Sequence, residues 1–355
     1  MNKVLLITTV YRVGEKIYPI IPELSKFCSI DLLRVNEMSY DMRWYGDIDP
    51  RMLFEARYID FIDDVYDAGF ESSRLNPSKE MIDFDIKGYD IILYDDDRNR
   101  HGVHLLYEQT QNTDCSMIGN VHGNWWFPPK SHITQFYKKA FDYAFVFGQK
   151  EKDASENNDY IFTVGIPSND ELKYYERTDD FILVIVNFLG NRDCPFDVQF
   201  DENFMKESGL LELQKEYDKR VVFKLKSRAD QPYPDKDFQY LASIVPKELD
   251  YIVMMDFEDN NQLICGASIV ISAPSTFAFK SIQKGIPTIL IDGAGITGNF
   301  YDYRGLVQLN KKDILNSVEE QIENGRDEEF INYTIEGGLD FNCTETYINK
   351  LRNFL

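Results

Sequence analysis

Short apolar runs rich in β-branched residues recur along the chain, and longer amphipathic stretches separate them. A run of about 4–8 such residues between turn signals is typical of a buried strand. Strands that alternate with amphipathic helices form βαβ units, in which the strands are parallel. The alternation therefore predicts an α/β fold in which helices cover both faces of parallel sheets.

The apolar runs form two series, each long enough for about five or six strands of a doubly wound sheet. The charged segment YYERTDD, at 174–180, separates the two series. Strands are predicted at 3–10, 29–35, 89–95, 115–123, 143–148, 160–165, 181–190, 220–226, 251–256, 268–274 and 287–293. Helices are predicted at 17–28, 52–70, 104–111, 131–141, 151–157, 202–219, 238–245, 260–267, 275–285, 312–325 and 344–355.

This pattern predicts two domains, residues 1–175 and residues 176–355, with the final helix able to cross back to the first domain. Ligands of doubly wound sheets bind at the carboxyl ends of the strands. We therefore expect the two sheets to face each other across a cleft that binds the ligand.

The chain carries 38 Lys and Arg against 60 Asp and Glu, a formal net charge of −22. Nucleic acid and anionic lipid both require positive surface, so this charge disfavours broad contact with either. No apolar stretch of about 18 residues is present, which predicts no membrane insertion. Five scattered cysteines are typical of reduced thiols. We expect a cytoplasmic protein.

The segment SAPSTFAFKSIQKGIP, from Ser272 to Pro287, places two hydroxyls at the start of a predicted helix. Ser275 or Thr276 can serve as the N-cap, and Gly285 suits the position that follows the last helical residue. The free amides and the dipole at the start of a helix also suit a diphosphate. The sequence leaves two alternatives open: an ordinary helix cap, or a phosphate site at the end of a buried strand.

A histidine follows another predicted strand in the segment GNVHGNWWFPP, at 119–129. His122 would lie at the carboxyl end of that strand, where Gly123 allows a sharp turn. An imidazole there can act as a general base near neutral pH. Trp125 and Trp126 can stack on a sugar ring or pack as a lid. The alternative for His122 is a hydrogen bond to the backbone with no ligand.

Three further segments follow strand ends in the second half, and each is either a ligand-binding loop or an ordinary surface turn. A basic cluster lies in FKLKSRAD, where strand alternation puts Lys224 and Lys226 on the same side. The residues that can approach a nucleotide diphosphate in these segments are Asn187, Gly190, Asn191, Arg192, Lys226, Arg228, Asp292, Gly293 and Asp302. No dinucleotide fingerprint and no Walker A sequence is present, which argues against NAD and FAD.

The order and spacing of these segments resemble the two-domain glycosyltransferases of the GT-B fold. NVHGNWWFPP, AFDYAFVFGQKEKDA and YIFTVGIPSNDEL resemble the motifs of the family's first domain. VVFKLKSRAD resembles a segment that usually contains K-L-H-P-R, and CGASIVISAPSTFAFKSIQKGIPTILID resembles the donor-binding segment. More narrowly, the chain resembles the CDP-glycerol glycerophosphotransferase-like and polysialyltransferase-like branch, with nucleotide-sugar 2-epimerases as more distant relatives. The resemblance covers about residues 85–305 and implies two tandem Rossmann-like domains that face each other across a cleft.

The resemblance also implies roles for particular residues. His122 is similar in position to a histidine that is proposed as the acceptor-side base. Ser275 and Thr276 match the paired hydroxyls that hold the donor diphosphate. Lys226 replaces the usual histidine of the K-L-H-P-R segment, and a lysine can still neutralise phosphate as a point charge. Gly123, Trp125 and Trp126 would line the acceptor side.

Two positions depart from the family pattern. Ala273 stands where relatives carry an aspartate before the hydroxyl pair. Lys280 stands where many GT-B enzymes carry the acid that binds the donor ribose. Asp292 or Asp302 is then the residue that could supply the ribose contact.

We therefore expect a metal-independent glycosyltransferase, or a glycerophosphotransferase-like enzyme, that moves a group from a nucleotide-diphosphate donor such as a UDP-sugar. The acceptor would be a saccharide or a surface polymer, and no cofactor is expected beyond the donor itself. The alternatives are a UDP-sugar 2-epimerase or hydrolase on the same fold, a DNA-base glycosyltransferase, which the net charge disfavours, and a non-catalytic GT-B-like binding protein.

Overall fold

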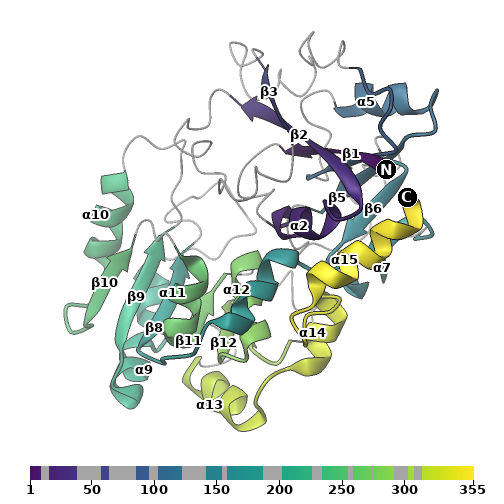
Figure 1. Ribbon diagram of the computed structural model, residues 1–355. Helices are drawn as coiled ribbons and strands as arrows, with labels where there is room; N and C mark the ends of the chain where they lie inside the picture. Colours follow the sequence, from purple (N-terminus) through teal and green to yellow (C-terminus); the bar gives the residue numbers. More distant parts are fainter. Residues whose placement is uncertain are drawn as a thin grey trace. The chain divides into compact units, whose positions relative to one another are not determined.

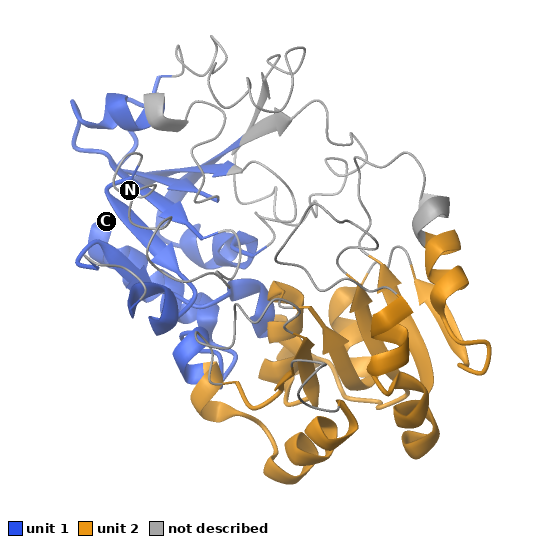
Figure 2. Cartoon of the chain, turned by 180° about the vertical axis from the view of Figure 1, so that it is seen from behind, with its two compact units in different colours: residues 1–124, 129–170, 332–355 blue, residues 125–128, 171–331 orange. Residues whose placement is uncertain are grey.

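The computed structural model describes residues 1–8, 16–37, 57–63, 85–95, 103–121, 141–153, 158–186, 202–225, 234–254, 259–273, 275–291, 303–307 and 314–355. The chain forms two compact units, which Figure 2 shows in different colours. Unit 1 comprises residues 1–124, 129–170 and 332–355, and unit 2 comprises residues 125–128 and 171–331. Each unit is built around a parallel sheet, so the predicted α/β class with two tandem Rossmann-like domains is confirmed.

Unit 1 contains a seven-stranded sheet with the order β3-β2-β1-β4-β5-β6-β7. Figure 1 labels β1, β2, β3, β5 and β6 of this sheet. Every neighbouring pair in it is parallel. Its strands are β1 (Asn2–Thr8), β2 (Cys28–Glu37), β3 (Arg57–Asp63), β4 (Ile91–Tyr94), β5 (Ser116–Asn120), β6 (Tyr143–Val146) and β7 (Ile161–Thr163).

The predicted helix at 52–70 is wrong over β3, which is a strand at the edge of this sheet. The segment RYIDFID also fits a strand, because a short apolar run satisfies helical and extended spacing alike. Seven residues of β3 pair in register with β2, from Asp31↔Arg57 to Glu37↔Asp63. Hydrogen bonding to a neighbouring strand therefore decides the conformation, and it gives unit 1 one more strand than predicted.

The helical segments of unit 1 are short. These segments are η1 (Tyr18–Ile20), α2 (Ile21–Leu24), α5 (Val103–Thr110), α7 (Gln149–Asp153), α15 (Cys343–Leu351) and η6 (Arg352–Phe354). The helix predicted at 17–28 is shorter than expected, because α2 ends at Leu24 and β2 already begins at Cys28. Two further segments cross the division between the units: η4 (Pro167–Tyr174) and α14 (Glu328–Thr334).

The helix α15 packs on the sheet of unit 1 although it lies far from the sheet in sequence. Its Tyr347 is fully buried, and the phenol donates a hydrogen bond to Asn120 Oδ1 at 2.7 Å. The ring of Tyr347 also meets Phe145 of β6 edge to face, with 5.1 Å between the centroids. Asp170 caps the helix, because its two carboxylate oxygens accept from the backbone N–H groups of Cys343 and Thr344, at 2.9 and 2.7 Å.

One glycine makes this packing possible. Gly165 follows β7 with φ of 76°, a left-handed conformation that favours glycine. A Cβ atom there would collide with the backbone carbonyl of Glu336 and would crowd Cys343. The glycine in the segment YIFTVGIPSNDEL therefore admits the chain that leads into α15.

Unit 2 contains a six-stranded sheet with the order β10-β9-β8-β11-β12-β13, again parallel throughout. Its strands are β8 (Phe181–Val186), β9 (Arg220–Leu225), β10 (Tyr251–Met254), β11 (Ala267–Ser272), β12 (Thr288–Ile291) and β13 (Leu306–Val307). Its helices are α8 (Glu202–Glu207), α9 (Leu210–Tyr217), α10 (Pro234–Ile244), α11 (Asn260–Gly266), α12 (Thr276–Lys284) and α13 (Ile314–Asn324).

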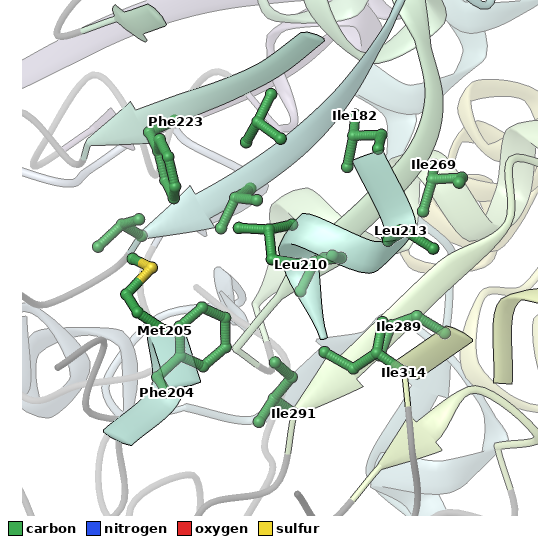
Figure 3. Close-up of a cluster of buried hydrophobic side chains, with 14 of the residues drawn as sticks. Ile182, Phe204, Met205, Leu210, Leu213, Phe223, Ile269, Ile289, Ile291 and Ile314 are labelled. Carbon is green, nitrogen blue, oxygen red and sulfur yellow. The ribbon is translucent and has the colours of Figure 1, made fainter. Parts of the chain in front are cut away.

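The single helix predicted at 202–219 is wrong in one respect, because it is two helices. Gly209 lies between α8 and α9 and has a φ of 67°, which a continuous right-handed helix cannot contain. The break lets both helices turn apolar side chains toward the sheet, with Phe204 and Met205 from α8 and Leu210 and Leu213 from α9 (Figure 3).

Unit 2 has a separate apolar core on each face of its sheet. The larger core, shown in Figure 3, joins β8, β9, β11 and β12 to α8, α9 and α13. The second core packs the other face of the same strands against α11 and α12, and it contains Leu183, Ile185, Val222, Leu263, Ile264, Ala267, Val270 and Ile286. Within the described ranges, no helix is long and apolar enough to cross a membrane.

Candidate functional site

The sheet order of unit 2 identifies one place where a ligand is expected. The chain runs from β8 outward to β9 and β10, and then returns to the other side of β8 to form β11 and β12. The order reverses between β8 and β11, and ligands of open α/β sheets bind outside the carboxyl ends of the strands at such a reversal. β8 ends at Val186 and β11 ends at Ser272. Residues just after these two ends are the candidates.

The helix α12 begins at this place, at Thr276, four positions after β11 ends at Ser272. Ser275 is its N-cap, with extended backbone angles (φ −154°, ψ 154°), and its hydroxyl accepts from the N–H of Ala278 at 3.3 Å. Gly285 ends the helix in the left-handed conformation, with a φ of 76°. The cap positions predicted from the sequence are therefore confirmed.

Two serine hydroxyls meet where β11 leads into α12. Ser272 is fully buried, and its hydroxyl donates to the carbonyl oxygen of Ala273 at 2.6 Å. It also lies 3.4 Å from the hydroxyl of Ser275. The contact joins the end of β11 to the N-cap of α12, and Ala273 is buried in the larger core of unit 2.

The first turn of α12 has donors that the helix itself does not use. Thr276 is the first helical residue and is partly exposed. Among the described residues, the Thr276 hydroxyl and the N–H groups of Thr276 and Phe277 have no hydrogen-bond acceptor. Such amides, together with the positive end of the helix dipole, form a general anion-binding arrangement.

The two lysines of α12 point toward neighbouring segments of unit 2. Lys280 Nζ donates to Asn261 Oδ1 at 2.9 Å, which joins α12 to α11. Lys284 Nζ donates to the carbonyl oxygens of Leu172 and Tyr175, at 2.7 and 2.6 Å. Lys280, at the position where the resemblance implied a ribose-binding acid, therefore contacts α11.

An aspartate caps α11 and also holds the start of unit 2. Asp259 accepts from the N–H groups of Asn261 and Gln262 at 2.9 and 3.0 Å. The Tyr175 phenol donates to the same carboxylate at 2.7 Å. This hydrogen bond, with a smaller contribution from burial, raises the pKa of Tyr175 to about 12.

In unit 1, the range of described residues that contains β5 ends at Val121, one position before His122. β5 runs through Asn120, whose amide donates to the carbonyl oxygen of Tyr94 at 2.9 Å. The N–H of Val121 then donates to the carbonyl oxygen of Phe145 at 2.9 Å. The strand that precedes His122 is thus held by β4, β6 and, through Tyr347, α15.

Most predicted site residues lie outside the described residues. Only Ser275 and Thr276 are placed, and the structure brings them together at the start of α12. The predicted residues that lie outside the described ranges are His122, Gly123, Trp125, Trp126, Asn187, Gly190, Asn191, Arg192, Lys226, Arg228, Asp292, Gly293 and Asp302.

One residue beside this place was not assigned to the site from the sequence. Lys224 of β9 is partly buried, and its ammonium lies 5.8 Å from the centroid of the Phe277 ring in the first turn of α12. The sequence put Lys224 on the same side as Lys226 within the basic cluster, but only the distance to Phe277 places it beside α12.

Comparison with known proteins supports the fold over the whole length. No family model matches the sequence, and no curated protein matches it significantly. Among solved structures, the chain is similar to UDP-GlcNAc 2-epimerase from Neisseria meningitidis bound to UDP-GlcNAc, with 13% identity, 99% of this chain and 100% of that chain covered, and a TM-score of 0.63.

Two other solved structures show the same similarity. A putative UDP-N-acetylglucosamine 2-epimerase from Listeria monocytogenes has 13% identity, covers 99% of this chain and 96% of its own, and gives a TM-score of 0.65. A glycosyltransferase from Rickettsia africae has 12% identity, covers 99% and 97%, and gives a TM-score of 0.59. At these identities the similarity establishes a shared GT-B-like fold.

Proposed function

We propose that this chain is a nucleotide-diphosphate-sugar enzyme whose second unit binds the donor diphosphate at the amino end of α12. The observation that carries the proposal is the start of this helix at the reversal of strand order in unit 2. The amides without an acceptor, the Thr276 hydroxyl and the positive end of the helix dipole all belong to the first turn of α12. UDP is the nucleotide to test, because a structurally similar protein was solved with UDP-GlcNAc bound.

The donors at the start of α12 can stabilise the negative charge of a diphosphate, both while it is bound in the donor and when it acts as the leaving group. Charge that develops on a leaving diphosphate is stabilised most by preorganised donors that need no rearrangement during the reaction. The amides of α12 are held by the Ser275 cap and by packing of Phe279 and Ile282 in the interior of unit 2. In this proposal Lys226 and Arg228 add positive charge, and Asn187, Asn191, Arg192, Asp292 and Asp302 line the nucleotide.

Epimerisation of a UDP-sugar at C2 is the first candidate reaction. Its support is the similarity in fold to several UDP-GlcNAc 2-epimerases over nearly the full length of both chains. A reaction of this class needs no acceptor. Incubation with UDP-GlcNAc alone is therefore expected to produce the C2 epimer, or free UDP and the released sugar, as followed by NMR.

Transfer of a sugar or glycerophosphate group to a saccharide or surface polymer is the second candidate. Its support is the resemblance of the sequence segments named above to the CDP-glycerol glycerophosphotransferase-like and polysialyltransferase-like branch, together with the fold of the Rickettsia glycosyltransferase. In this reaction His122 takes the proton of the acceptor, and Trp125 and Trp126 line the acceptor side. His122→Ala would then abolish transfer and leave UDP affinity within about twofold of the wild type.

Binding of UDP tests the part that both reactions share. Isothermal titration calorimetry with UDP and with uridine should give measurable binding of UDP, because only UDP has the diphosphate. Thr276→Ala should weaken UDP binding by about tenfold, the effect of losing one hydrogen bond to a charged group. Ser268→Ala removes a hydroxyl near the opposite end of β11, where it donates to the Phe181 carbonyl oxygen, and serves as the matched control.

Two outcomes would contradict the proposal. One is the absence of UDP binding by the wild-type chain, which would favour a protein without a nucleotide site. The other is equal loss of UDP and uridine affinity in Thr276→Ala, which would place the hydroxyl away from the diphosphate.

A further inference from the structure

We propose that Lys224 is a further diphosphate-binding residue, which supplies positive charge to the ligand at the amino end of α12. The inference rests on the proposed function and deepens it. It adds to the site a cation from β9, the strand next to β8 on the side away from β11.

Lys224 and Ser272 stand in one row across the sheet. Ile185 of β8 is in register with Lys224 of β9 on one side and with Ser272 of β11 on the other. Neighbouring strands are separated by about 4.8 Å, so the backbone positions of Lys224 and Ser272 are roughly 10 Å apart. A lysine side chain can span much of that distance. The row lies at the carboxyl ends of the strands, where the ligand is expected.

The alternation of β9 puts Lys224 on the face that α11 and α12 cover. Val222, two positions earlier, belongs to the core between the sheet and these two helices, as does Ile185. Phe223 and Leu225, one position to either side of Lys224, belong to the core on the opposite face. Lys224 is therefore the polar residue that continues the α12 side of β9 toward the carboxyl end.

The side chain of Lys224 reaches the first turn of α12. Its ammonium lies 5.8 Å from the centroid of the Phe277 ring, within the range of a cation–π contact. Phe277 is the second residue of the helix, and its ring packs against the core that contains Ile185 and Val222. Lys224 as a whole is partly buried, and its ammonium lies beside the first turn of α12.

A cation at this place changes what the helix terminus can hold. Amides and hydroxyls contribute partial charges, whereas an ammonium contributes a full positive charge in a partly desolvated position, where charge interactions are stronger than in water. The whole chain has a net charge of −22, which repels an anion at long range. Lys224 thus offsets this repulsion locally and favours a ligand with two phosphates over an uncharged nucleoside.

The test compares two substitutions of Lys224 with one control in the same unit. Lys224→Met keeps the length and the apolar stem but removes the charge, and Lys224→Arg keeps the charge. Lys215→Met removes a charge from an exposed position of α9, on the opposite face of the sheet. Each chain is titrated calorimetrically with UDP and with uridine at low and at high salt, after thermal denaturation without ligand has shown that it folds.

Lys224→Met should weaken UDP binding by about tenfold at low salt and by less at high salt, because salt screens the lost interaction. Uridine affinity should not change, and Lys224→Arg and Lys215→Met should bind UDP within about threefold of the wild type. If the wild type binds UDP and Lys224→Met binds it equally well, the inference fails and the proposed function stands. If the wild type does not bind UDP, the proposed function and the inference both fail.

Discussion

Ser275 has a structural role in addition to the proposed one, whereas Thr276 does not. The Ser275 hydroxyl accepts from the N–H of Ala278, and it also meets the buried hydroxyl of Ser272. Thr276, one residue later, has no hydrogen-bond acceptor among the described residues. The roles of the two hydroxyls can therefore be distinguished by measuring both stability and ligand binding for Ser275→Ala and Thr276→Ala.

Ser275→Ala should lower the free energy of unfolding by about 1 kcal/mol, because it removes the N-cap of α12. Thr276→Ala should lower it by less than about 0.5 kcal/mol, since the first helical position makes no capping bond. Urea denaturation without ligand measures both values. Equal losses for the two variants would mean that the cap is not the source of stability.

Ionisation of Cys115 makes the free energy of unfolding depend on pH in the alkaline range. Burial, helped by the negative charges of Asp142 and Asp90, raises the pKa of its thiol from 9.0 to about 12. The unfolded chain loses this proton near pH 9 while the folded chain retains it, so the stabilisation is complete below pH 9 and is lost as the pH rises toward 12. Partial solvent screening reduces the size of the effect.

Between pH 8 and pH 10, the wild type should lose roughly 0.5–1 kcal/mol more stability than Cys115→Ala, in which this group cannot titrate. Urea denaturation at the two pH values gives the difference. Parallel losses in both proteins would show that Cys115 ionises alike in the folded and unfolded chains.

At the scale of elements, α15 depends on a cap from a distant segment. Asp170 lies in the segment YIFTVGIPSNDEL and accepts two backbone N–H groups from the first turn of α15. The carboxylate also has a favourable interaction with the positive end of the helix dipole. The aspartate of this sequence motif therefore joins η4 to α15 inside unit 1.

Asp170→Ala should lower the free energy of unfolding by about 2 kcal/mol, because it leaves two amides without an acceptor. Asp170→Asn should have a smaller effect, since its amide oxygen can still accept one of them. Asp340→Ala, which removes an exposed carboxylate just before α15, is the control. Urea denaturation of the whole chain measures the loss of unfolding free energy, and hydrogen exchange shows whether α15 loses protection. Unchanged stability and protection in Asp170→Ala would mean that Asp170 does not stabilise α15 as a cap.

The sequence predicts elements well where periodicity and end signals agree. α12 is the clearest example, because its Ser275 cap and its Gly285 end both match the structure. The prediction fails for β3, because its seven residues fit the spacing of a helix as well as that of a strand, and pairing with β2 decides the conformation. It also fails at Gly209, because a glycine inside an amphipathic pattern does not reveal its backbone angle.

The candidate site is predicted in part for a similar reason. Hydroxyls at the start of a helix can be found from local sequence, so Ser275 and Thr276 were identified. Lys224 depends on which side of β9 faces α12 and on how far the strand extends. Tyr347 carries no local signal for its hydrogen bond to Asn120, since 227 positions separate the two residues.

At the scale of the whole molecule, the two units have separate cores, and they differ in how many stretches of the chain form each unit. Unit 2 is formed almost entirely by one stretch, residues 171–331, whereas unit 1 combines residues from both ends of the chain. Phe354 illustrates this, because its ring contacts Tyr143, Phe145 and Phe162 at centroid distances of 4.5, 5.8 and 5.2 Å. Destabilisation of one core should therefore be detected mainly in its own unit.

Tyr347→Ala should destabilise unit 1 by about 3–5 kcal/mol, the usual cost of removing a large buried ring. Phe204→Ala in α8 is the matched variant for unit 2, because Phe204 is equally well buried. Hydrogen exchange with mass spectrometry should show lost protection in unit 1 for the first variant and in unit 2 for the second. Loss across both units in either variant would mean that they unfold together.

The long separation between Asp170 and α15 has a consequence for synthesis of the chain. The ribosome delivers β1 to β7 first, then the whole of residues 171–331, and only afterwards the helix that Asp170 caps. Domains generally fold as units while the chain is still growing. Unit 2 can thus be complete while the nascent unit 1 still exposes the rings of Phe145 and Phe162, which are covered only when Tyr347 and Phe354 have been synthesised.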